Sequence, residues 1–138
     1  MAEQDNVALI RKMYEAFGAG DVKTILDSAS PDAEWVNYGP STVPYMGNFN
    51  GRVPAFFQAI GETTTGGKVT AGKYIAEGDI VVTLGRYTAT VRGTGVKIDT
   101  PIAHIFTIRD GKVASWAGFS DSAAVAAAHS GAASSAKG

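Results

Sequence analysis

Four long segments in the second half of the chain are separated only by short glycine-containing turns. They run over 68–76, 80–91, 96–108 and 112–120 and are rich in Val, Ile, Thr and aromatic residues, a composition typical of β-strands. Turns this short can join only strands that lie antiparallel. The pattern therefore predicts an antiparallel meander, and it restricts the fold to architectures that can cover one face of such a sheet.

Gly85 and Pro101 stand inside two of these segments. Glycine and proline both disturb regular strand pairing, so we expect a bulge or a bend at each position. A bulge also changes which neighbouring residues face the core, because side chains alternate between the two faces of a strand.

The first half of the chain has the period of helices. Apolar residues recur at spacings of three and four over 7–17, 22–29 and 52–60, which predicts three amphipathic helices. The sequence Ser30-Pro31-Asp32 is expected to end the second helix, and alternation over 33–38 predicts one early strand. The expected fold class is α+β: three N-terminal helices packed on the concave face of a strongly curved, mostly antiparallel sheet that encloses a conical pocket.

Length and composition narrow the classes of protein. The 138 residues fit a single domain over 1–138, with an ordered core over about 5–128 and a flexible Ala/Gly/Ser-rich tail. A hydrophobic fraction of 45% excludes general disorder, and a net charge of -1 argues against nucleic-acid and polybasic membrane surfaces. No apolar run is long enough to cross a membrane and the N-terminus is unlike a signal peptide, so we expect a cytoplasmic protein.

Motifs for metals and cofactors are not evident. The absence of cysteine excludes disulfides, thiol nucleophiles and cysteine-ligated metals. The two histidines, His104 and His129, are far apart in the sequence, and there is no phosphate-binding loop or dinucleotide fingerprint. We therefore expect no metal and no cofactor.

Several short motifs occur in a recognisable order and spacing. They are FGAGD at 17–21, WVNYG at 35–39 with PYMG at 44–47, the segment 51–57, and IFTIRDGKV at 105–113 followed by WAGFSD at 116–121. With these motifs the chain resembles, over about 7–128, the superfamily of nuclear transport factor two, ketosteroid isomerase, SnoaL-like polyketide cyclases and limonene epoxide hydrolase. The resemblance implies a conical α+β fold, but no single activity, because this fold hosts many.

The catalytic carboxylates of these relatives have no counterpart in this sequence. The position of the ketosteroid isomerase general base matches Asn37, which has no titratable proton. The isomerase oxyanion-hole residues match Met13 and Ala103, with Tyr14 one residue away. The last-strand aspartate of the cyclases and the epoxide hydrolase matches Gly118. The resemblance therefore implies a site outline that lacks its carboxylates.

Three polar side chains remain candidates for chemistry. His104 is a candidate acid or base, but strict alternation turns it away from the pocket if Ala103 faces inward, and the alternative is a hydrogen-bonded core histidine. Asp121 is a candidate catalytic carboxylate at the pocket mouth, or the N-cap of a helix that begins at the next residue. Arg86 could stabilise an anionic oxygen in the pocket, or it points outward.

Aromatic residues and one amide are candidates for the pocket wall. Asn37 beside Trp35 would form a polar floor next to a large aromatic surface, or Asn37 simply bonds to the backbone while Trp35 packs in the core. Further candidates for substrate binding are Tyr14, Tyr45, Phe56, Phe57, Arg86 and Trp116. The alternative for these aromatics is ordinary core packing.

These residues support three hypotheses of function. The first is a SnoaL-like protein that binds a hydrophobic carbonyl or enol compound of polycyclic or terpenoid size. His104, Asn37 and Asp121 would then carry acid–base chemistry of the isomerase, cyclase or hydrolase kind. The alternative is a non-catalytic ligand-binding or accessory protein that has lost the family carboxylates. A protein-interaction scaffold has little support in the composition. Under all three we expect a homodimer formed through the exposed sheet face.

Overall fold

The computed structural model describes residues 2–131. In chain order its elements are α1 (Ala2–Gly18), α2 (Val22–Asp27), β1 (Ala29–Asn37), β2 (Gly47–Asn48), α3 (Val53–Thr63), β3 (Thr64–Glu77), β4 (Ile80–Val91), β5 (Lys97–Arg109), β6 (Lys112–Ser120) and α4 (Ser122–Ser130). The expected C-terminal tail lies largely outside the described residues. None of the helices within 2–131 is long and apolar enough to span a membrane.

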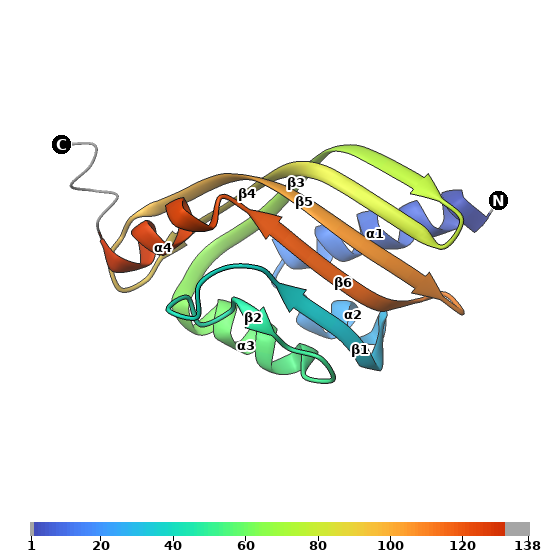
Figure 1. The fold of residues 1–138 in the computed structure, drawn as a ribbon, viewed down its shortest axis with the longest axis horizontal. Coiled ribbons are helices and arrows are strands. Elements are labelled where there is room, and N and C mark those ends of the chain that lie inside the picture. Colours follow the sequence, from blue (N-terminus) through green and yellow to red (C-terminus); the bar gives the residue numbers. More distant parts are fainter. Residues whose placement is uncertain (1, 132–138) are drawn as a thin grey trace.

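The strands form one bent sheet of six strands in the order β2-β1-β6-β5-β4-β3. The predicted meander is confirmed, because β3 to β6 pair antiparallel with their neighbours in sequence. The early strand β1 lies beside β6 and runs parallel to it. Helices α1, α2 and α3 lie on the inner side of the bend, and α4 follows β6 at one end of the sheet (Figure 1). The α+β class is therefore confirmed.

The segment around Pro31 differs from the prediction. Helix α2 ends at Asp27 and strand β1 already begins at Ala29, so residues 30–32 are not the end of the helix. The pairing of β1 with β6 jumps from Ala29–Val113 to Glu34–Ser115. Pro31 thus lies where β1 has no partner on β6, and its missing N–H leaves no gap in the sheet.

The bulges expected at Gly85 and Pro101 are also absent from those positions. Pairing between β4 and β5 continues through both residues, and the shift lies instead on β3, between Ala71 and Lys73. Gly85 faces this bulge at very close range. Pro101 is accommodated because β6 pairs with β5 only from Ile102 onward, so on that side no partner strand meets its missing N–H.

Replacing Gly85 with alanine is expected to lower the free energy of unfolding by about 2–3 kcal/mol. The added Cβ would lie 2.1 Å from the Thr70 carbonyl oxygen and 2.8 Å from the Ala71 Cα, and backbone atoms of a bulge cannot rotate away. Urea unfolding measures the loss. Gly93→Ala is the control, since nothing lies within 4 Å of a Cβ there. Equal losses in both variants would contradict this account of Gly85.

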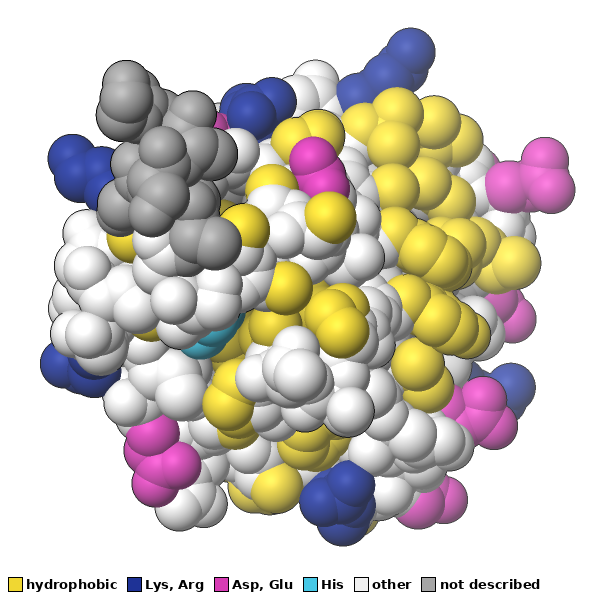
Figure 2. Space-filling model, turned by 60° about the vertical axis from the view of Figure 1, so that its left-hand side comes forward, with side chains coloured by type: hydrophobic (Ala, Val, Ile, Leu, Met, Phe, Trp, Pro, Cys, Tyr) yellow, Lys and Arg dark blue, Asp and Glu magenta, His cyan; other side chains and the backbone are white. Residues whose placement is uncertain are grey.

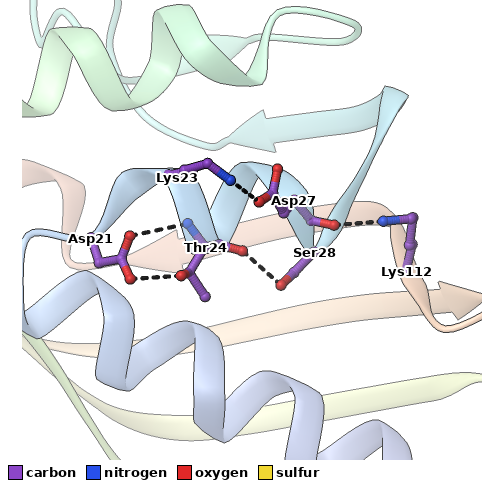
Figure 3. A network of polar contacts seen from close by, with 6 residues as sticks. All are labelled: Asp21, Lys23, Thr24, Asp27, Ser28 and Lys112. Carbon is purple, nitrogen blue, oxygen red and sulfur yellow. Dashed lines mark hydrogen bonds and ion pairs between the residues drawn. The ribbon is translucent and has the colours of Figure 1, made fainter.

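A polar network fixes the short helix α2 against the sheet (Figure 3). The Asp21 carboxylate accepts hydrogen bonds from the Thr24 backbone N–H and hydroxyl, at 3.2 and 2.6 Å. At the other end of the helix, the Lys112 ammonium donates to the Asp27 carbonyl oxygen at 2.6 Å. The helix is thus capped at its start and tied to β6 at its end, which holds Ile25 buried against the core.

Strict alternation gives the sheet two different faces. On the concave face, His104 pairs with Gly118 and Phe106 with Trp116. On the convex face, Leu84, Ile105 and Phe119 are about two-fifths exposed. In Figure 2 hydrophobic side chains gather in a patch on one side of the molecule, with charged side chains around it. The match of Ala103 to a pocket-facing family position is therefore wrong by one residue, because no bulge interrupts β5 there.

Candidate functional site

A cavity of about 100 Å³ lies between the concave face of the sheet and the helices. Its wall is mostly aromatic. None of its described lining residues is Asp, Glu, Lys or Arg. Eight of the residues expected at the site line it, namely Tyr14, Trp35, Asn37, Tyr45, Phe56, Phe57, His104 and Trp116. The arrangement suits an uncharged, apolar molecule with few polar atoms.

A hydrogen-bonded chain of three side chains crosses one wall of this cavity. The Tyr14 hydroxyl lies 2.6 Å from the Thr83 hydroxyl and 2.7 Å from His104 Nδ1. Thr83 is fully buried and His104 is 9% exposed. The chain joins α1 to two adjacent strands, β4 and β5, so the positions of all three groups are fixed by the fold.

The environment keeps both titratable members of this chain uncharged at neutral pH. Burial lowers the pKa of His104 to about 3, because the imidazolium would lose its hydration. Burial also raises the pKa of the Tyr14 hydroxyl above its ordinary value, although the hydrogen bond with Thr83 opposes part of this shift. Neither group is poised to exchange a proton near pH 7.

Two tryptophans and an amide form the opposite wall. The rings of Trp35 and Trp116 stack at 5.0 Å, and Trp116 also meets the His104 ring edge-on at 5.0 Å. The indole N–H of Trp35 is buried without a hydrogen-bond partner. Asn37 donates from Nδ2 to the Tyr45 carbonyl oxygen at 3.0 Å. The wall thus offers an unused N–H group next to a flat aromatic surface.

Gly118 explains why this site has no carboxylate on β6. A Cβ at this position would lie 2.4 Å from the Trp116 ring and 2.9 Å from Asn37 Oδ1. The space that a family aspartate would occupy is therefore filled by neighbouring side chains of this chain. The absence of a carboxylate at position 118 and the position of the Trp116 ring therefore go together, because the ring occupies the space that the carboxylate would need.

Helix α4 and the loop over 39–46 close one end of the cavity. Val125 on α4 lines the cavity and is 1% exposed. The Tyr45 hydroxyl lies 2.7 Å from His129 Nε2, and the Thr94 hydroxyl donates to the Ala128 carbonyl oxygen at 2.8 Å. Partial burial lowers the pKa of His129. These contacts hold α4 against the loop over 39–46 and against the turn between β4 and β5.

Two of the expected site residues lie away from the cavity wall. Asp121 is exposed and caps α4, where its carboxylate accepts from the Ala124 N–H at 3.2 Å, as the alternative interpretation expected. Arg86 forms an exposed ion pair with Asp99 at 2.7 Å. Neither Asp121 nor Arg86 lies among the cavity-lining residues.

Sequence reasoning missed Thr83 and Tyr87. Thr83 stands among valines and leucine on β4, where threonine is an ordinary strand residue. Tyr87 lines the cavity, and its hydroxyl is buried near those of Tyr45 and Thr64 without a well-formed hydrogen bond. The only available signal was the even spacing of Thr83, Gly85 and Tyr87, which sets them on the same face.

Metal ligands do not gather in the part of the chain that the structure describes. No three His, Asp or Glu side chains among residues 2–131 lie close enough to hold an ion.

Solved structures of similar fold cover nearly the whole chain. An NTF2-like protein of unknown function from Burkholderia pseudomallei superposes with a TM-score of 0.83 at 23% identity, over 90% of this chain and 96% of that one. TerC, co-crystallised with polyporic acid, gives 0.81 at 25% identity over 91% and 98%. A candidate SnoaL-like polyketide cyclase from a Jannaschia species gives 0.77 at 25% identity over 93% of each chain.

The sequence comparisons point to the same group. No curated protein sequence shows significant similarity to this chain. The family model of the SnoaL-like domain, however, matches residues 10–116, which include α2, α3 and five of the six strands in full, together with parts of α1 and β6. The chain belongs to the SnoaL-like domain family, with the NTF2-like fold.

Proposed function

We propose that this protein binds a small, uncharged, apolar molecule in its cavity. The observation that carries the proposal is the cavity itself, walled by aromatic side chains and without a charged residue among its described lining. Apolar surface removed from water supplies the affinity, and a few fixed polar groups supply orientation. Similar proteins are also associated with organic small molecules, since TerC was crystallised with polyporic acid and two others are named as candidate polyketide cyclases.

The size of the cavity limits the ligand. An apolar cavity of about 150 Å³ holds benzene, whereas this one measures about 100 Å³. A single small ring is therefore close to the limit of the closed form. A polycyclic or terpenoid ligand exceeds this volume, and separation of α4 from the loop over 39–46 to admit it would break the Tyr45–His129 hydrogen bond.

The chemistry of the site favours hydrogen bonding to a carbonyl or enol oxygen over proton abstraction. Tyr14 and His104 are uncharged at neutral pH and the family carboxylates are missing. A reaction that needs only polarisation of an oxygen remains compatible with this site. The second candidate function is binding without turnover, and it is favoured specifically by the Trp116 ring that fills the carboxylate position beside Gly118.

Native mass spectrometry of freshly purified protein tests the binding proposal. Wild-type protein is expected to carry a small-molecule adduct that is released on activation. Ile102→Phe should lose it, because Ile102 is buried and lines the cavity. Ala103→Phe is the matched control, because it adds the same ring one residue away on the convex face. An adduct that Ile102→Phe retains in full would contradict binding in the cavity.

We further propose that two copies of the chain associate through their convex sheet faces. This face presents large apolar side chains that no described element covers, with exposures from 38% for Ile105 to 52% for Tyr38. Apolar patches of this kind are uncommon on monomers, and sheet-on-sheet packing of two copies is self-complementary.

A cytoplasmic location for the protein is likewise proposed.

Sedimentation velocity tests the association. Ile105→Lys is expected to convert a dimer to a monomer, because a lysine at the centre of the face would be buried without a partner. Val22→Lys is the control, since Val22 is similarly exposed, at 37%, but lies on α2. A wild-type monomer, or a dimer that Ile105→Lys leaves intact, would contradict the proposal.

A further inference from the structure

We infer that Tyr14 holds His104 as the tautomer protonated on Nε2, so that His104 and Trp35 together offer two N–H donors to an oxygen atom of an uncharged ligand. The inference rests on the proposed binding function and specifies the ligand class. Two observations support it: the hydrogen bonds that join the side chains of Thr83, Tyr14 and His104, and the Trp35 indole N–H, which has no hydrogen-bond partner in the protein.

The proton count of the buried chain selects one arrangement. Thr83 can donate its hydroxyl proton to the Tyr14 oxygen, and Tyr14 can donate its own proton to His104 Nδ1. Both hydroxyl protons of the chain then have an acceptor. The imidazole proton must lie on Nε2, because neutral imidazole carries only one N–H.

The reverse arrangement leaves a buried proton without an acceptor. If His104 donated from Nδ1 to Tyr14, the Tyr14 proton would have to go to Thr83. The Thr83 proton would then have no acceptor, since this fully buried hydroxyl makes no other hydrogen bond. The first arrangement also leaves one donor without a protein partner, His104 Nε2–H, but His104 lines the cavity, whereas Thr83 is fully buried. A donor buried away from any acceptor is costly, so the first arrangement is the stable one.

The second donor is the Trp35 indole. Its ring is 2% exposed, lines the cavity, and its N–H has no partner. The Trp116 ring contacts both the Trp35 ring and the His104 ring, each at 5.0 Å between centroids. The two rings that carry these N–H groups are therefore neighbours of the same Trp116 ring in the cavity wall.

These donors define the ligand by its chemistry. Two N–H groups call for a hydrogen-bond-accepting oxygen, as in a ketone, an enone or a cyclic ether. The described cavity wall has no cation to balance a carboxylate, so burial of an anion is disfavoured. A hydrocarbon of the same shape fits the cavity but leaves both donors unused.

The tautomer is tested directly by nitrogen NMR of ¹⁵N-histidine-labelled protein at neutral pH. Wild-type His104 should show a protonated Nε2 and an unprotonated Nδ1. Tyr14→Phe should lose this selection and give a mixture, whereas Thr83→Val should keep it, because Tyr14 still donates to Nδ1. A wild-type Nδ1–H signal, or a Tyr14→Phe spectrum with unchanged tautomer, would overturn the inference.

The ligand class is tested with cyclopentenone and cyclopentene, which differ by the carbonyl oxygen. Cyclopentenone is expected to shift the Trp35 indole and His104 Nε2 proton resonances downfield, while cyclopentene shifts only the side-chain resonances of apolar residues such as Val125. If both probes leave the N–H resonances equally unshifted while perturbing Val125, the donor inference fails and cavity binding stands. If neither probe perturbs the cavity, both the inference and the proposed function fail.

Discussion

Acidification from pH 7 to pH 4 is expected to lower the free energy of unfolding by about 3 kcal/mol through His104 alone. The pKa of this imidazole is about 3 in the folded protein, against 6.5 for the unfolded chain, because burial disfavours the charged form. Between pH 6.5 and pH 3, the His104 imidazole is therefore protonated in the unfolded state and neutral in the folded state. The stabilisation is complete above pH 6.5 and is lost as the pH falls toward 3.

Urea unfolding of wild type and His104→Gln at both pH values isolates this contribution. Glutamine does not titrate, so the variant should lose less stability on acidification, by about the same 3 kcal/mol. Carboxylates and His129, whose pKa is also lowered, act in both proteins and cancel in the comparison. Parallel losses in wild type and variant would show that His104 is not buried as a neutral group.

Restoring a carboxylate by Gly118→Asp is expected to destabilise the protein by about 3–5 kcal/mol. The new Cβ would lie 2.4 Å from the Trp116 ring, and the charge would enter an apolar wall without a cation. A single substitution therefore cannot recover the arrangement of the relatives.

The steric part of this loss can be separated from the electrostatic part. Gly118→Ala removes the charge but keeps the clash, and should lose most of the stability that Gly118→Asp loses. In the Trp116→Ala background, which removes the two shortest contacts and leaves the one at 2.9 Å to Asn37 Oδ1, the added cost of Gly118→Ala should become clearly smaller. An undiminished cost in that background would contradict the account of Gly118.

The fold was largely predictable because its long strands have a strand-forming composition and are separated by short glycine-containing turns. This composition over the last four strands and the helical spacing at 7–17 are strong local signals. The errors arose where a local cue depended on a distant partner. Pro31 stands in a strand because β6 leaves it unpaired, and Gly85 is needed because of a bulge on β3. Neither fact is visible in the residues around them.

The site was predictable in most of its wall, but the hydrogen bonding of its polar chain was not. Aromatic residues were expected to line a cavity, and most of those singled out do. Matching by family position pointed to Met13 and Ala103, of which only Met13 lines the cavity. Tyr14 and His104, which were candidates in their own right, form the hydrogen bond. A shift of one residue reverses the face of a strand, and only the pairing of β4, β5 and β6 settles it. For Thr83 the sequence offers only its even spacing from Gly85 and Tyr87.

Cavity binding is read most directly from tryptophan emission, because Trp35 and Trp116 are the chain's two tryptophans and both line the cavity. Cyclopentenone quenches indole on contact, and a chain without cysteine offers it no thiol to alkylate. Titration with cyclopentenone should quench the tryptophan emission of wild type and of Ala103→Phe until it reaches a plateau. The emission of Ile102→Phe should be quenched only weakly, in proportion to the cyclopentenone concentration. Weak, proportional quenching that is identical in all three proteins would contradict the proposal that this cavity binds an uncharged apolar molecule.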